Sequence, residues 1–228
     1  VTIPTSGGGG GGGGGNSWTM EVLESSRNEG FGSSMAIDDN GNIHVSYYDY
    51  DMTSDLEVRY GFFDGTDWYT ETIASGLGSL FRAHSTELVL EDGYCPVILY
   101  YSEDARQLRI QYSMPNGGGG NTPCTWDETP TVVATDSSGT AANVNALYSL
   151  AVDGDGNNRV THISYTFYCD VIGACDADLM YASFDESEDT EWQFETIATS
   201  SLTGFNSIQS GVDGEIHIAY YDADTNIV

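Results

Sequence analysis

Residues 34–75 read SMAIDDNGNIHVSYYDYDMTSDLEVRYGFFDGTDWYTETIAS, and this stretch decides the fold class. It contains four short runs rich in β-branched and aromatic residues, at Met35–Ile37, Ile43–Tyr48, Leu56–Phe62 and Trp68–Ala74. Asn40-Gly41 and Asp64-Gly65 lie between runs, and such dipeptides favour the tight turns of β-hairpins. The stretch therefore predicts a four-stranded antiparallel sheet.

The same pattern recurs along the chain with a period of about 50 residues, which indicates a repeat protein. Further units begin at Glu87, Leu150 and Ser207. Repeated four-stranded sheets arranged around an axis form a β-propeller. We therefore expect an all-β fold, a four-bladed β-propeller over residues 16–228, preceded by a separate segment at residues 1–15.

The tryptophans indicate how this propeller closes. The four of them occupy the same place in successive repeats, at Trp18, Trp68, Trp126 and Trp192. Trp18 precedes the first complete unit, whereas the fourth unit stops at Val228 before its outer strand. We therefore expect residues 16–25 to complete the C-terminal blade, which leaves no open sheet edge at the junction. The alternative is a fragment of a longer array of blades. In both cases the rings are expected to pack between adjacent blades.

Charge and cysteine content restrict the environment and the partners. The net charge is −29, from 35 acidic and 6 basic residues, which disfavours nucleic acid and anionic lipid. No apolar run is long enough to span a membrane. Four cysteines without zinc-site spacing predict an extracellular or cell-surface protein with disulfides Cys95–Cys124 and Cys169–Cys175. The other two connectivities remain open.

The hairpin Asp64-Gly65-Thr66-Asp67-Trp68 and the strand His44-Val45-Ser46-Tyr47-Tyr48-Asp49 resemble the repeats of secreted bacterial propellers, those of sialidase-like (Asp-box) and lectin proteins. The resemblance covers residues 16–228 and implies a fold rather than an activity. The Ser and the spacing of a full Asp-box are absent. A sialidase would also need an arginine cluster, of which Phe81-Arg82-Ala83-His84 gives only a partial match.

Acidic residues near the predicted turns are candidates for a calcium site. Carboxylate oxygens are the ligands that calcium prefers. The candidates are Asp49, Asp51, Asp222 and Asp224 on one face of the disc, with Asp153 and Asp155 on the opposite face. Asp-Gly and Asn-Gly pairs are also what tight turns select. Apart from calcium, no cofactor is expected.

The N-terminal segment suggests a structural role. Val1, Thr2 and Ile3 form a short β-prone run, and Gly7–Gly15 tethers it. We expect this run to add to a sheet edge of another copy and to link copies head to tail into a fibre. The simpler interpretation is a flexible tail. The predicted function is a non-catalytic structural or adhesive protein that binds copies of itself or surface glycans. The alternative is a carbohydrate-binding or glycosidase-type propeller.

Overall fold

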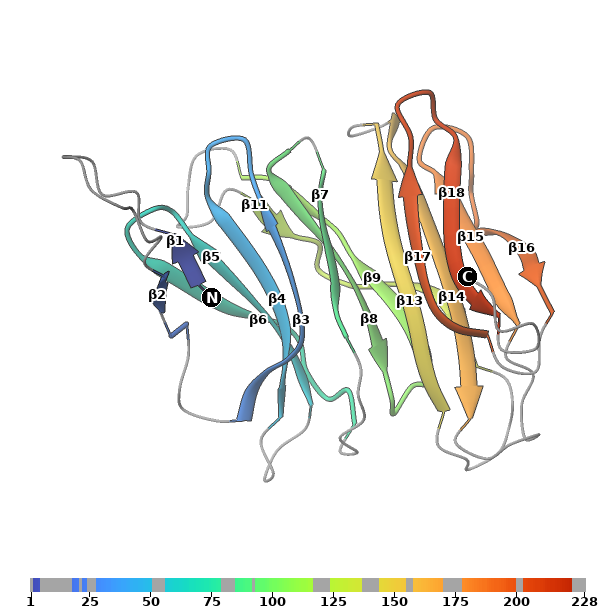
Figure 1. Cartoon of the computed structure of the whole chain (residues 1–228), viewed down its shortest axis with the longest axis horizontal. Helices are drawn as coiled ribbons and strands as arrows, with labels where there is room; N and C mark the ends of the chain where they lie inside the picture. The colour runs from blue at the N-terminus through green and yellow to red at the C-terminus, as the bar shows by residue number, and fades with distance from the viewer. Residues whose placement is uncertain are drawn as a thin grey trace, which may run out of the picture.

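The computed structural model describes residues 2–4, 18–20, 22–23, 28–50, 56–78, 85–91, 93–116, 124–136, 144–154, 158–169, 178–199 and 203–222. The regular elements there are β-strands, so the expectation of an all-β fold is confirmed (Figure 1). Across these ranges, no helix has the length and hydropathy needed to cross a membrane.

Three antiparallel sheets of four strands each form the body of the protein. The first contains β3 (Asn28–Ile37), β4 (Ile43–Tyr50), β5 (Glu57–Phe63) and β6 (Trp68–Ala74) in this order. The second contains β7 (Glu87–Glu91), β8 (Cys95–Ser102), β9 (Gln107–Gln111) and β12 (Thr131–Thr135). The third contains β13 (Val144–Asp153), β14 (Val160–Cys169), β15 (Leu179–Asp185) and β16 (Gln193–Ala198).

Three two-stranded sheets accompany them. They pair β17 (Thr203–Ser210) with β18 (Ile216–Asp222), β10 (Ser113–Pro115) with β11 (Cys124–Trp126), and β1 (Thr2–Pro4) with β2 (Trp18–Met20). The first of these corresponds to the inner half of a fourth repeat.

The sheets stack face to face in the order of the sequence (Figure 1). Their first strands, β3, β7, β13 and β17, lie side by side. Strand β8 is buried along its whole length because neighbouring sheets cover both of its faces. Strand β18 alternates between half-buried and exposed residues, since only one of its faces is covered. The stacking therefore explains why the middle repeats have nearly continuous apolar strands.

The repeats have the same pairing register. Four equivalent hairpins place Met35 opposite Val45, Leu88 opposite Ile98, Leu150 opposite Ile163, and Ile208 opposite Ile218. A shift of one residue would turn every side chain to the other face. The conserved register therefore confirms the repeat that the sequence predicted and makes positions in different sheets comparable.

Large apolar clusters fill the two interfaces between four-stranded sheets. Tyr60 and Ile98 belong to the cluster between the first and second sheets, and Leu99 and Ile163 to the one between the second and third. Trp126 packs in the former, edge-on to Tyr60 at 5.1 Å between ring centroids, and Trp192 packs against the latter. The expectation that tryptophans fill the space between sheets is confirmed for these two rings. Trp126 lies on β11, however, because a turn separates it from the outer strand β12.

The N-terminal strand differs from the expectation. We expected residues 16–25 to pair with the last sheet, but β2 pairs with β1 of the same chain. The two strands are close in sequence, so their pairing costs less loop-closure entropy than pairing with β18. Figure 1 shows β2 at one end of the stack and β18 at the other. Leu23 nevertheless packs on the outer face of the first sheet, beside Val45 and Gly61.

The disulfide between Cys95 and Cys124 is present, as the sequence predicted, with a Cα–Cα distance of 5.6 Å. It joins the start of β8 to the start of β11. The side chain of Cys169 and the whole of Cys175 lie outside the described residues, so the second disulfide stays a prediction.

Candidate functional site

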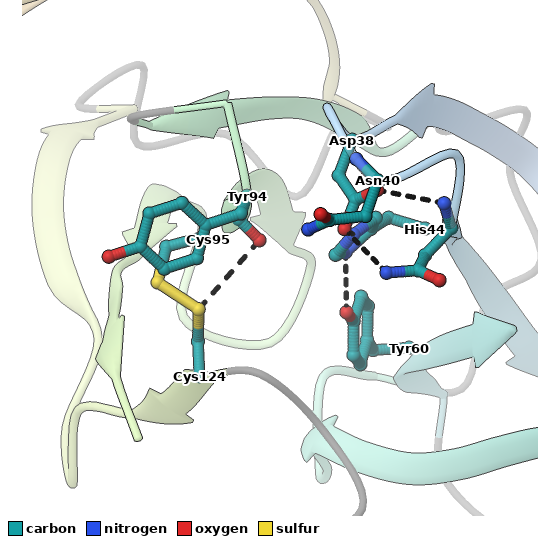
Figure 2. Close-up of polar contacts among 8 residues, drawn as sticks. Asp38, Asn40, His44, Tyr60, Tyr94, Cys95 and Cys124 are labelled. Atoms are coloured by element: carbon teal, nitrogen blue, oxygen red, sulfur yellow. Dashed lines mark hydrogen bonds and ion pairs between the residues drawn. A yellow bond between two sulfur atoms is a disulfide. The ribbon is translucent and has the colours of Figure 1, made fainter. Parts of the chain in front are cut away.

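A buried Asp–His–Tyr group lies at the hairpin between β3 and β4. The Nδ1 atom of His44 is 2.7 Å from the Tyr60 hydroxyl, and its Nε2 atom is 3.6 Å from Oδ2 of Asp38 (Figure 2). Burial lowers the pKa of His44 and raises that of Tyr60, so the ring is neutral and the tyrosine keeps its proton. The Tyr60 hydroxyl therefore donates to Nδ1, and the ring proton on Nε2 faces Asp38.

The carboxylate of Asp38 also accepts hydrogen bonds from residues of its own turn. Its Oδ1 atom accepts hydrogen bonds from the backbone N–H groups of Asn40 and Asn42, at 2.9 and 2.8 Å (Figure 2). Oδ2 accepts one from the Asn42 side chain at 2.8 Å. Burial raises the pKa of Asp38, but these hydrogen bonds outweigh it and leave the pKa below its ordinary value. The hydrogen bonds from Asn40 and Asn42 to Asp38 therefore fix the conformation of this turn.

The third sheet repeats this group. His162 Nδ1 is 2.7 Å from the Tyr181 hydroxyl, and Nε2 is 3.5 Å from Oδ2 of Asp153. Burial again lowers the pKa of the histidine. In the last sheet, His217 lies 3.7 Å from Glu215 and is exposed. Because the group is repeated in the first and third sheets, with the same contacts in each, we assign it to the architecture rather than to a site.

A second polar cluster lies at the opposite edge of the stack, where the inner strands begin. The Tyr48 hydroxyl donates to the carbonyl of Tyr101 and accepts from its N–H, each at 2.9 Å. The Tyr148 hydroxyl bonds to the carbonyl of Ser85 and to Tyr48. One hydroxyl from each of the first and third sheets thus meets the backbone of the second, which brings three repeats together at one place.

Glu87 is the ionisable residue that distinguishes this edge. It begins β7 and occupies the register position held by Ser34, Ser149 and Ser207 in the other sheets. The serines of the first and third sheets accept a backbone N–H from the next sheet, from Leu88 at 3.0 Å and Ile208 at 3.2 Å. Burial raises the pKa of Glu87 to about 7. The second sheet therefore has a half-buried carboxyl near its titration midpoint where the others have a hydroxyl.

We predict that Glu87→Gln stabilises the protein above neutral pH. A carboxyl with a raised pKa in the folded chain binds more protons than in the unfolded chain, so stability falls as pH rises from the ordinary Glu value through 7. Removing this titration should raise the free energy of unfolding at pH 8 by about 3 kcal/mol and leave it nearly unchanged at pH 4. Urea unfolding of both proteins at the two pH values measures the effect. Parallel pH profiles would contradict the shifted pKa.

The predicted calcium ligands are not brought together among the described residues. Asp49 lies near the end of β4 in the first sheet, and Asp222 ends β18 beyond two intervening sheets. Asp153 lies at the other edge beside His162. No group of three or more metal-binding side chains occurs within the part of the chain that the structure describes. Calcium binding stays a prediction, because Asp51, Asp155 and Asp224 lie outside that part.

The predicted assembly segment is partly described. Thr2 and Ile3 lie in β1, opposite Met20 and Thr19 of the same chain. Head-to-tail assembly through this segment stays a prediction. Val1 lies outside the described residues.

Comparison with known proteins adds little to this geometry. No protein-family model matches the chain, and no curated protein matches it. A solved structure that is similar is an exo-1,5-alpha-L-arabinanase from a bovine ruminal metagenomic library, with 12% sequence identity and a TM-score of 0.42. The alignment covers 92% of this chain and 79% of that one. A likeness at this level gives no information about ligand or activity.

Sequence reasoning missed Glu87 and the tyrosine cluster. A signal was present, because alignment of the four repeats puts Glu87 at a position that is otherwise serine. The tyrosine contacts had no such signal, since Tyr48, Tyr101 and Tyr148 meet across three repeats.

Proposed function

We propose that the sheets are blades of a β-propeller that binds a neutral, polyhydroxylated ligand, a carbohydrate, without chemical turnover. The single observation that carries this is the half-buried carboxyl of Glu87 close to Tyr148 of the tyrosine cluster. The first strands of the four repeats lie side by side, which supports this proposal because the first strands of the blades line the centre of a propeller. The Cys95–Cys124 disulfide supports an extracellular location.

The chemistry of Glu87 suits a sugar hydroxyl. A carboxyl with a pKa of about 7 is part protonated at neutral pH, so it both donates and accepts hydrogen bonds. Tyr48 and Tyr148 are buried, with 1% and 4% exposure, whereas Glu87 is half-buried, so Glu87 is the most accessible of these three groups. The net charge of −29 repels anionic ligands, which leaves neutral ones favoured.

A glycan array followed by calorimetry tests this function. We expect binding of neutral saccharides by the wild type, and at least about a tenfold loss in Glu87→Ala because the central polar contact is removed. Glu215→Gln is the control, since Glu215 is an exposed carboxylate on the distant β17–β18 turn. Equal binding by Glu87→Ala, or no neutral saccharide bound by the wild type, would overturn the proposal.

A structural protein that associates with its own copies is the second candidate. Apolar side chains stay uncovered at the two ends of the stack, and this observation favours self-association.

A further inference from the structure

The outer face of the first sheet is uncovered at a position that is buried in every other repeat. Leu88, Leu150 and Ile208 occupy this position in the later sheets, are exposed by 5%, 5% and 4%, and each faces the preceding sheet. Met35 is their equivalent by register, and it is 55% exposed. Ile37, two residues on along the same face, is 61% exposed. Leu23 covers Val45 on the same face, so the uncovered part of the first sheet is its first strand, β3, at Met35 and Ile37.

The last sheet is uncovered on its opposite face. His44 is fully buried by the second sheet, whereas its equivalent His217 has a side chain that is 70% exposed. Phe205 on the neighbouring strand β17 is 79% exposed. Ser207 is exposed as well, although the equivalent Ser34 and Ser149 each accept a backbone N–H from a following sheet.

The two uncovered faces are therefore complementary by the repeat itself. At the first and third of the three internal interfaces, the apolar position of one sheet packs against the serine-bearing face of the sheet before it, whereas Glu87 replaces the serine at the second. Met35 and Ile37 offer the first half of such an interface, and Phe205 and Ser207 offer the second. The faces lie at opposite ends of the stack, with two sheets between them (Figure 1).

We propose that these faces join two copies of the protein head to tail, independently of the carbohydrate site. In this contact the backbone N–H of Met35 donates to the Ser207 hydroxyl of the neighbouring copy, as Leu88 does to Ser34 within the chain. Met35 and Ile37 cover Phe205 of that copy. Residues 1–3, which the sequence pointed to, are not required. Because the two faces differ, the contact is heterologous and repeats from copy to copy.

The charge of the protein sets the conditions for this contact. Each copy carries a net charge of −29, so copies repel one another at low ionic strength. As the salt concentration rises, this repulsion acts over a shorter range. Salt does not weaken apolar contacts and can strengthen them. Association is therefore expected to increase with salt, opposite to the behaviour of a contact made by ion pairs.

Analytical ultracentrifugation in low and high salt tests the proposal. The wild type should form dimers and longer species in high salt, whereas Met35→Asp and Phe205→Asp should each stay monomeric because a charge replaces an apolar contact. The two variants mixed together should form a dimer and nothing larger, since each keeps one intact face. Val212→Asp is the control, because Val212 is a fully exposed apolar residue at the β17–β18 turn, outside the two proposed faces.

Two results would overturn the proposal. One is a wild type that stays monomeric in high salt. The other is association that persists in both single variants, which would place the contact elsewhere, for example at residues 1–3. Far-ultraviolet circular dichroism and the urea midpoint of each variant establish that it is folded. Should Met35→Asp fail to fold, Ile37→Asp probes the same face.

Discussion

Arg159→Met is expected to lower the free energy of unfolding by about 3–5 kcal/mol, the cost of breaking a buried ion pair by removing one partner. Arg159 is 8% exposed and lies directly before β14 in the third sheet. Its guanidinium binds Glu91 of the second sheet at 2.6 Å and also pairs with Glu186. The Tyr112 ring lies against it, 3.9 Å from the Cζ atom. Methionine keeps the apolar stem and removes the charge.

The cost arises mainly at Glu91. Its carboxylate side chain is 7% exposed, so without Arg159 a charge is left buried with its main counter-ion gone. Urea unfolding followed by tryptophan fluorescence measures the loss. Arg109→Met is the matched control, because the Arg109 guanidinium bonds to the neutral Gln107 amide on its own strand. That variant should lose about 1 kcal/mol. Equal losses in the two variants would show that the charge of Arg159 does not hold the second and third sheets together.

Removing the Cys95–Cys124 disulfide is expected to cost about 3–4 kcal/mol, which follows from the entropy of closing a loop of this length. The two cysteines are 29 residues apart. The bond fixes β11, and with it Trp126, against the second sheet; Trp126 in turn donates a hydrogen bond to Glu71 at 2.8 Å in the first sheet. The double variant Cys95→Ser/Cys124→Ser, compared with wild type by urea unfolding without reductant, measures the effect.

Reductant provides the control for this experiment. It should destabilise the wild type by a similar amount, because it opens the same bond. Reductant added to the double variant can change its stability only through the remaining cysteines, Cys169 and Cys175. A double variant as stable as the oxidised wild type would show that packing alone holds β11 in place.

Three of the four strands of the first repeat could be predicted closely from the sequence, whereas the first, predicted at Met35–Ile37, begins at Asn28. The predicted run Trp68–Ala74 is β6 residue for residue, and Ile43–Tyr48 lies within β4. Local features decide such elements: alternation places one face inward, and Asn40-Gly41 or Asp64-Gly65 permits the reversal, with Gly41 and Gly65 at positive φ. The disulfide Cys95–Cys124 was predicted correctly for a similar reason, since both cysteines flank the same repeat.

The candidate site could not be predicted in the same way. The carboxylates that the sequence pointed to, Asp49, Asp153 and Asp222, lie in different sheets or at different edges, because a turn motif does not specify which turns become neighbours. Alignment of the repeats puts Glu87 at a position that is otherwise serine, but the alignment does not show that its carboxyl is partly buried. Its raised pKa results from burial, which sequence position alone does not reveal.

By itself, the sequence determined the all-β class, the repeat and its register, and the packing role of Trp126 and Trp192, since these depend on residue periods and on turns a few residues long. The tertiary structure decided which strand β2 pairs with and which faces of the first and last sheets stay uncovered. The tryptophan alignment joined Trp18 to the last sheet, whereas the structure pairs β2 with β1 and leaves the faces of Met35 and Phe205 uncovered. The physical reason is that a strand's alternation fixes which side chains share a face, whereas the partner of that face depends on competing edges and on the entropy of the chain between them.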